Sequence, residues 1–126
     1  MHQDNREMTK QIKDCIAACE VCASICGECH DDMIGMSHVD HAGDMDLMAR
    51  CIRLCRECAD ICHLSAAWMS RLSPFSEAVC RLCAEICDAC AEACEQHAPE
   101  HALCGPCAKE CRRCAEACRH MAGAAA

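Results

Sequence analysis

Apolar residues and cysteines recur every three or four positions over four separate stretches of this chain, and polar side chains fill most positions between them. Residues at this spacing share one face of an α-helix, and a regular alternation of three and four forms the seam along which helices pack. The pattern predicts helices over residues 4–36, 44–72, 74–97 and 100–122. Short connections between them favour an all-α, antiparallel up-down-up-down four-helix bundle, with residues 1–126 in a single domain.

The connections between the predicted helices carry turn and capping signals. Residues 37–43 are too polar and too rich in turn formers to continue the first helix. Asp44 is a good N-cap for the second helix. Ser73 and Pro74 form a start signal for the third helix, as N-cap and first helical residue.

A glycine and a proline interrupt the fourth stretch at Gly105 and Pro106. A proline in a helix interior costs about 3 kcal/mol, because it removes a hydrogen bond and clashes with the preceding turn. We therefore expect the fourth helix either to begin at Pro106 or to kink there. Either outcome predicts that Cys104 sits at an irregular and more accessible position than the other cysteines.

The seam positions are occupied almost entirely by cysteine. All 19 cysteines of the chain lie on the four seams, although only about two positions in seven are seam positions. The pattern therefore predicts an interior lined with thiols. We take all of the cysteines as candidate metal ligands: Cys15, Cys19, Cys22, Cys26, Cys29, Cys51, Cys55, Cys58, Cys62, Cys80, Cys83, Cys87, Cys90, Cys94, Cys104, Cys107, Cys111, Cys114 and Cys118.

Composition and charge narrow the possible partners. The net charge of −8 argues against nucleic acid, which requires a basic face. No stretch approaches the 18 or so apolar residues of a membrane span, and the first residues carry no export signal. We therefore expect the cytoplasm, where thiols stay reduced, and this favours metal binding over disulfide formation.

A continuous ladder of thiols suits Cu(I) better than other soft ions. Zinc prefers four ligands around one isolated ion, and iron–sulfur clusters usually draw on irregular loop cysteines. Cu(I) accepts two or three thiolates, and one thiolate bridges two ions, so the expected capacity is about one Cu(I) per cysteine. The alternative is a general thiolate sink for zinc, cadmium or silver, of metallothionein type. A redox enzyme is a weaker third reading, because the Cys-x-x-Cys motif needs a βαβ setting, and we expect no enzymatic activity.

Four helices with repeated Cys-x-x-x-Cys and Cys-x-x-Cys steps resemble the bacterial copper storage proteins, and the missing export signal resembles their cytosolic branch. The likeness runs from Cys15 to Cys118. It implies a bundle filled along its axis with Cu(I)–thiolate sites, which stores or detoxifies copper and often assembles as a homotetramer. A copper chaperone or a small-thiol donor is the partner expected beside the copper ions themselves.

The two ends of the predicted bundle differ in chemistry. One end, called the Met/His end below, gathers thioether and imidazole groups that bind Cu(I) without losing a proton at neutral pH. These groups are candidate ligands for incoming ions: Met33, Met36, His38, His41, Met45, Met48, His97 and His101. The other end, called the apolar end, is expected to form a plug from Met8, Ile12, Ser65, Trp68, Met69, Leu72, Phe75 and Met121.

Overall fold

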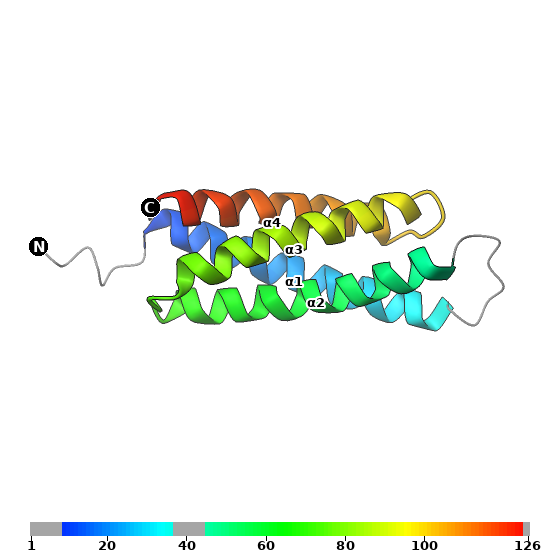
Figure 1. Cartoon of the computed structure of the whole chain (residues 1–126), viewed down its shortest axis with the longest axis horizontal. Helices are drawn as coiled ribbons and strands as arrows, with labels where there is room; N and C mark the ends of the chain where they lie inside the picture. Colours follow the sequence, from blue (N-terminus) through cyan, green and yellow to red (C-terminus); the bar gives the residue numbers. More distant parts are fainter. Residues whose placement is uncertain (1–8, 37–44, 125–126) are drawn as a thin grey trace, which may run out of the picture.

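The computed structural model of this protein describes residues 9–36 and 45–124. These residues form four α-helices and no β-strand (Figure 1), and the helices are α1 Lys10–Met36, α2 Met45–Ser70, α3 Ser76–His97 and α4 Cys104–Ala124. Each helix packs against two neighbours: α1 and α3 both lie between α2 and α4. The prediction of an all-α four-helix bundle is therefore confirmed.

The first helix begins after Thr9, a capping residue that its seam pattern does not predict. The Thr9 hydroxyl oxygen accepts a hydrogen bond from the Ile12 backbone N–H at 3.2 Å, and the Thr9 carbonyl accepts one from Lys13 N–H at 3.0 Å. This is the arrangement of an N-cap. The helix was predicted to begin near residue 4, which lies outside the described residues, as does the predicted cap Asp44.

The connection between α2 and α3 is longer than predicted, because α2 ends at Ser70 and α3 begins at Ser76. Leu72 has a φ of 55°, and the N–H groups of Leu72 and Ser73 donate to the carbonyls of Met69 and Trp68, both at 3.0 Å. This is a Schellman ending, normally built on glycine, and it stops α2 at Ser70 rather than near Leu72. The helix therefore ends two residues earlier than its seam pattern predicts.

The predicted start of α3 at Ser73 and Pro74 is wrong by about two residues. The Ser73 hydroxyl oxygen accepts a hydrogen bond from the Phe75 N–H at 3.0 Å, which makes a local turn of the kind serine favours. The helix begins at Ser76, with Phe75 as an N-cap that supplies no side-chain hydrogen bond. Ser73 was predicted to cap α3, but its hydroxyl stabilises the turn that precedes the helix.

The prediction for the start of α4 is also wrong. The helix begins at Cys104, so that Pro106 is its third residue. The backbone nitrogens of the first four helical residues have no hydrogen-bond acceptor within the helix. The proline therefore breaks no hydrogen bond, and the Cys107 N–H donates to the Leu103 carbonyl at 2.9 Å. The Cys104 side chain is fully buried. The expectation of an accessible cysteine is therefore wrong, because Pro106 fits into the first turn of α4 and does not displace Cys104 from the helix.

The four helices present sulfur to the bundle axis and charge to solvent. Isoleucines beside the seams pack against the buried core. None of the described helices is long and apolar enough to cross a membrane. On the outside, Arg112 pairs with Asp88 at 3.1 Å and with Glu95 at 3.0 Å, which links α3 to α4. Exposed pairs of this kind contribute at most about 1 kcal/mol, so helix packing holds the bundle together.

Candidate metal centre

The cysteines of α1 and α4 face each other in antiparallel register. Each step along α1 toward its C-terminus is matched by an equal step along α4 toward its N-terminus. The five resulting Sγ–Sγ pairs are Cys15–Cys118 at 3.7 Å, Cys19–Cys114 at 3.7 Å, Cys22–Cys111 at 3.7 Å, Cys26–Cys107 at 3.6 Å and Cys29–Cys104 at 3.7 Å. The two helices therefore form one column of thiol rungs.

A second column joins α2 to α3 with the same antiparallel stepping. Its Sγ–Sγ pairs are Cys51–Cys94 at 3.7 Å, Cys55–Cys90 at 3.8 Å, Cys58–Cys87 at 3.5 Å and Cys62–Cys83 at 3.7 Å. This column has four cysteine rungs. We call the two columns together the thiol ladder. Its nine rungs hold 18 of the 19 cysteines, and Cys80, which precedes Cys83 on α3, lies beyond the last rung of the second column.

Contacts across the bundle axis join the two columns. Cys58 Sγ lies 3.8 Å from Cys22 Sγ and 3.9 Å from Cys111 Sγ, and Cys62 Sγ lies 3.8 Å from Cys114 Sγ. Groups of four sulfurs lie within 4.8 Å of one another at successive levels of the bundle. All 19 cysteines are buried and free of disulfides, so the interior is a continuous array of reduced thiols.

The sulfur spacing fits bridged soft ions after small movements. A metal–sulfur bond of about 2.3 Å places two sulfurs about 4.6 Å apart on opposite sides of an ion, and about 4.0 Å apart around a trigonal one. The rungs measure 3.5 to 3.8 Å, so a thiol pair must open by about 0.2 to 1.1 Å. Rotation of the cysteine side chains supplies such a movement without displacing the helices.

Hydrogen bonds between thiols raise the pKa values of some cysteines and lower those of others. A hydrogen bond with Cys104 lowers the pKa of Cys29 to about 5. In contrast, hydrogen bonds with Cys107 and Cys114 raise the pKa values of Cys111 and Cys118 respectively, and burial raises both further. Neighbouring thiols of the ladder thus differ in how readily they release a proton, and the protons that remain leave when a cation takes their place.

Four of the residues predicted for the Met/His end lie buried beside the last thiols. The Met33 thioether sulfur accepts a hydrogen bond from the Cys104 thiol at 3.9 Å. Met48 is buried on α2, and His97 and His101 stack edge to face with ring centroids 5.9 Å apart. The Nε2 atom of His97 has no hydrogen-bond partner among the described residues, which leaves a nitrogen donor available near the thiols.

The other four residues predicted for the Met/His end are placed differently. The Met45 side chain is about half exposed, at 51%, at the start of α2. Met36 is the last residue of α1. His38 and His41 lie outside the described residues.

At the apolar end, one methionine predicted as part of a plug contacts the ladder directly. The Cys80 thiol donates a hydrogen bond to the Met69 thioether sulfur at 3.6 Å, and Met69 is buried. The Trp68 and Phe75 rings lie farther out, with centroids 6.2 Å apart. The seam position of Met69, which continues the spacing of the α2 cysteines, predicts its burial but not its contact with Cys80.

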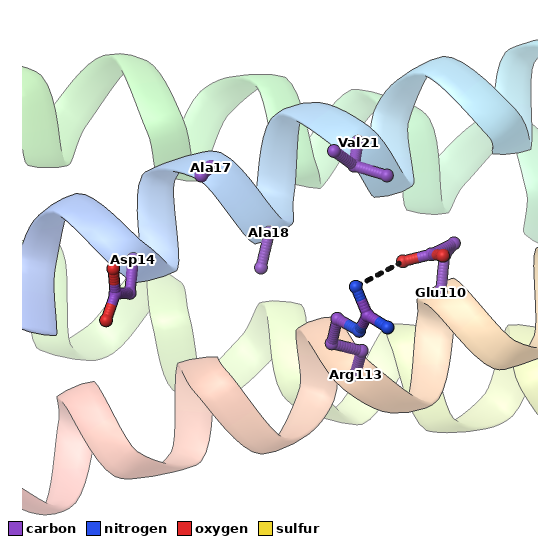
Figure 2. Close-up of a pocket in the computed structure, with 6 residues that line it drawn as sticks. All are labelled: Asp14, Ala17, Ala18, Val21, Glu110 and Arg113. Atoms are coloured by element: carbon purple, nitrogen blue, oxygen red, sulfur yellow. Dashed lines mark ion pairs between the residues drawn. The ribbon is translucent and has the colours of Figure 1, made fainter.

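A hollow of about 210 Å³ lies on the outside of the bundle between α1 and α4, and it is unrelated to the ladder. Figure 2 shows that its lining comes from the outer faces of the two helices, where Arg113 pairs with Glu110 at 3.7 Å. The remaining lining residues are Asp14, Ala17, Ala18 and Val21. Because no sulfur lines this hollow, its chemistry does not suit a soft metal.

A four-helix bundle with a continuous interior of reduced thiols defines a binding protein for many soft metal ions. The comparison with known families identifies the class more closely, since residues 1–123 match the copper storage protein (Csp) family. The chain belongs to this family. The cysteine-lined interior is therefore a copper store, and the protein is not an enzyme.

Individual relatives agree with the family assignment. The chain is 43% identical over 94 residues to the cysteine-rich protein YhjQ of Bacillus subtilis, covering 75% of this chain and 82% of the relative. The Cu(I)-bound copper storage protein BsCsp3 has a TM-score of 0.77 and 41% identity, over 90% of this chain and 99% of that one. A cytosolic copper storage protein from Streptomyces lividans, solved with five coppers, has a TM-score of 0.80 and 35% identity, over 90% and 93%.

Proposed function

We propose that this chain stores Cu(I) as thiolate-bridged ions along the whole ladder, with a capacity of about one ion per cysteine. The observation that carries the proposal is the unbroken succession of Sγ–Sγ contacts from Cys29 and Cys104 at one end to Cys15 and Cys118 at the other. Eighteen of the 19 cysteines form the rungs, and Cys80 adds its sulfur at the apolar end, 3.6 Å from the Met69 sulfur.

Charge balance favours Cu(I) over zinc in this interior. One Cu⁺ per thiolate leaves the ladder close to neutral, whereas Zn²⁺ bound by four thiolates leaves two negative charges at each site. Uncompensated charge in a buried place is expensive, and the described cations lie on the outer surface, as Arg112 and Arg119 do. A ladder filled with Cu(I) therefore needs no counter-charge from the protein.

Separate titrations with Cu(I) and Zn(II) test this proposal against the general thiolate sink. We expect loading near one Cu(I) per cysteine, retained against a strong Cu(I) chelator. Saturation at about four or five zinc ions, which is the number that four thiols per ion allow, combined with weak Cu(I) uptake, would favour the sink. Disulfide-isomerase activity at catalytic rates would instead support the redox reading.

We further propose that ions enter at the Met/His end. The buried Met33, Met48, His97 and His101 supply neutral donors beside the last thiols, and Met36, Met45, His38 and His41 are proposed to extend this set outward. Neutral thioether and imidazole groups bind Cu(I) more weakly than thiolate. An ion caught there can therefore pass inward to Cys29 and Cys104.

A location and an assembly are also proposed for this chain. We place the protein in the cytoplasm, in keeping with the Streptomyces lividans relative that is described as cytosolic. A copper chaperone or small-thiol donor is the proposed source of the ions. The family resemblance suggests a homotetramer, and Val21, Leu64 and Leu82 expose apolar side chains on three helices. Light scattering on the purified chain measures its mass, and a monomer would contradict the assembly.

A further inference from the structure

The second column of the ladder lacks one thiol at the apolar end. Ser65 follows Cys62 by three residues on α2, and Cys80 precedes Cys83 by three residues on α3. The antiparallel register therefore places Ser65 opposite Cys80, where a fifth cysteine rung would complete the column. The chain carries 19 cysteines, and this serine stands at the position that a twentieth would occupy.

Cys80 nevertheless has a sulfur neighbour on α2. Met69 lies four residues beyond Ser65, on the same face of the helix, and its thioether sulfur is 3.6 Å from Cys80 Sγ. That distance falls within the range of the thiol rungs, 3.5 to 3.8 Å. Cys80 also interacts with the thiols of Cys15 and Cys118, so Met69 extends the sulfur array by one atom.

The hydroxyl at the missing rung is buried without a partner. Ser65 is 0% exposed, and its Oγ has no hydrogen-bond partner among the described residues. A buried donor left unsatisfied costs about 1–3 kcal/mol. A thiolate formed nearby on copper binding is an acceptor that would remove this cost, so the loaded state satisfies a group that the empty state does not.

We propose that Cys80 and Met69 hold a terminal Cu(I) ion at the apolar end, with Met69 as a ligand of mixed thiolate–thioether type and Ser65 as a hydrogen-bond donor to the Cys80 sulfur. The inference rests on the proposed storage function and adds a ligand to it. On binding, Cu⁺ forms a bond to Cys80 Sγ, whose proton leaves to solvent, and the Met69 sulfur donates a lone pair without losing a proton. The completed site is neutral.

Neutrality explains why a thioether suits this place better than a twentieth thiol. Inside the ladder each thiolate is shared between ions, but an ion at the end has no further ion beyond it. A second thiolate there would leave a negative charge in a fully buried site, which is costly. A thioether completes the coordination of a soft ion and adds no charge.

The test follows the methionine methyl groups of the full-length, reduced chain by NMR. The protein is labelled with ¹³C at the methionine methyl carbon and saturated anaerobically with Cu(I), and the Met69 signal is assigned from the Met69→Leu variant. We expect the Met69 methyl signal to move on loading, because its sulfur gains a metal bond. Met121, a buried methionine at the same end, is the control and should move much less.

Variants at the missing rung separate coordination from mere proximity. Ser65→Ala removes the hydroxyl and should leave the Met69 shift in place. Ser65→Cys restores the rung, so the new thiolate should displace the thioether and return the Met69 signal toward its metal-free position. Met69→Leu, a volume-conserving change, should lose about one chelator-resistant ion, whereas Met121→Leu should lose none.

The outcomes separate this inference from the storage function. A full load of about one Cu(I) per cysteine with an unmoved Met69 signal would overturn the mixed site and leave storage intact. A Met69 shift that persists unchanged in Ser65→Cys would also overturn it, because proximity alone would then explain the signal. A low total load in the parent chain would overturn storage itself, and the mixed site with it.

Discussion

The Sγ atoms of Cys26 and Cys111 lie 3.5 Å apart, although 85 residues separate them in the chain. Cys111 also lies 3.7 Å from Cys22 and 3.9 Å from Cys58. One thiol in the middle of the bundle thus touches cysteines of two other helices. Positions of this kind are where a single thiolate can bridge the largest number of ions.

Replacing Cys111 by serine should therefore lower the copper capacity by about two ions, because a hydroxyl is a poor ligand for a soft metal. The matched control is Cys15→Ser at the apolar end, where Cys15 forms the last rung with Cys118 and the expected loss is about one ion. Metal analysis after gel filtration gives the counts, and far-UV circular dichroism checks that both variants are folded. Equal losses would contradict bridging that is denser in the middle.

The Met/His end should control the rate of copper movement and not the capacity. Replacing His97 and His101 together with Met33, Met36 and Met48 by leucine or alanine should slow uptake and removal. The final load should stay nearly unchanged, because the thiol ladder is intact. Stopped-flow loading of the variant against the parent measures the rates, and equal rates would leave these residues with a packing role only.

The metal-free protein should lose stability at alkaline pH. Hydrogen bonds between thiols raise the pKa of one partner and lower that of the other, as for Cys111 and Cys107, whereas burial raises the pKa of both. Burial therefore sets the net direction over the ladder, and an unfolded thiol titrates near pH 8.5. Above that value the unfolded chain releases these protons before the folded chain does, so the free energy of unfolding falls as the pH rises. Below it the stabilisation is fully present.

Thermal unfolding between pH 7 and pH 10, followed by circular dichroism under reducing conditions, checks this prediction. The copper-loaded protein is the control, because its thiolates carry no protons to lose and its unfolding temperature should depend less on pH. A metal-free protein that gains stability from pH 8 to pH 10 would show the opposite linkage and would contradict the raised pKa values.

The helices should form without metal. Protonated thiols behave as small apolar groups, and aliphatic residues such as Ile16, Ile52 and Ile86 pack beside them. Copper should then fill a bundle that already exists and displace about one proton from each protonated thiol. Far-UV circular dichroism of the reduced metal-free chain decides the matter: a random-coil spectrum that becomes helical only with Cu(I) would mean that the metal builds the fold.

The parts of the structure that could be predicted are those set by local spacing. Four helices and a buried cysteine face follow from steps of three and four residues, and the structure contains both. The predictions are wrong where one residue is compatible with two local structures, as a serine is with a helix cap or a turn. Ser73 makes a turn with Phe75 instead of capping α3, and Pro106 falls inside the first turn of α4, where it does no harm.

In the candidate site too, local spacing predicts some features and helix packing sets the others. The burial of the 19 cysteines and of Met33, Met48, His97 and His101 was predictable from their positions along the chain, and their role as copper ligands stays a prediction. The contact between Met69 and Cys80 was not, because it depends on how far α2 is shifted against α3. The half-exposed side chain of Met45 likewise depends on how α2 begins and not on residue type.

The sequence by itself determined which face of each helix is buried, because residues three and four apart share a face whatever the helix packs against. It did not determine which thiol meets which. The seams repeat nearly every seven residues, so sliding one helix by a heptad against its neighbour would again bring cysteines largely opposite cysteines. Only the tertiary structure, through the connections and the packing at the bundle ends, pairs Cys29 with Cys104 and leaves Ser65 facing Cys80.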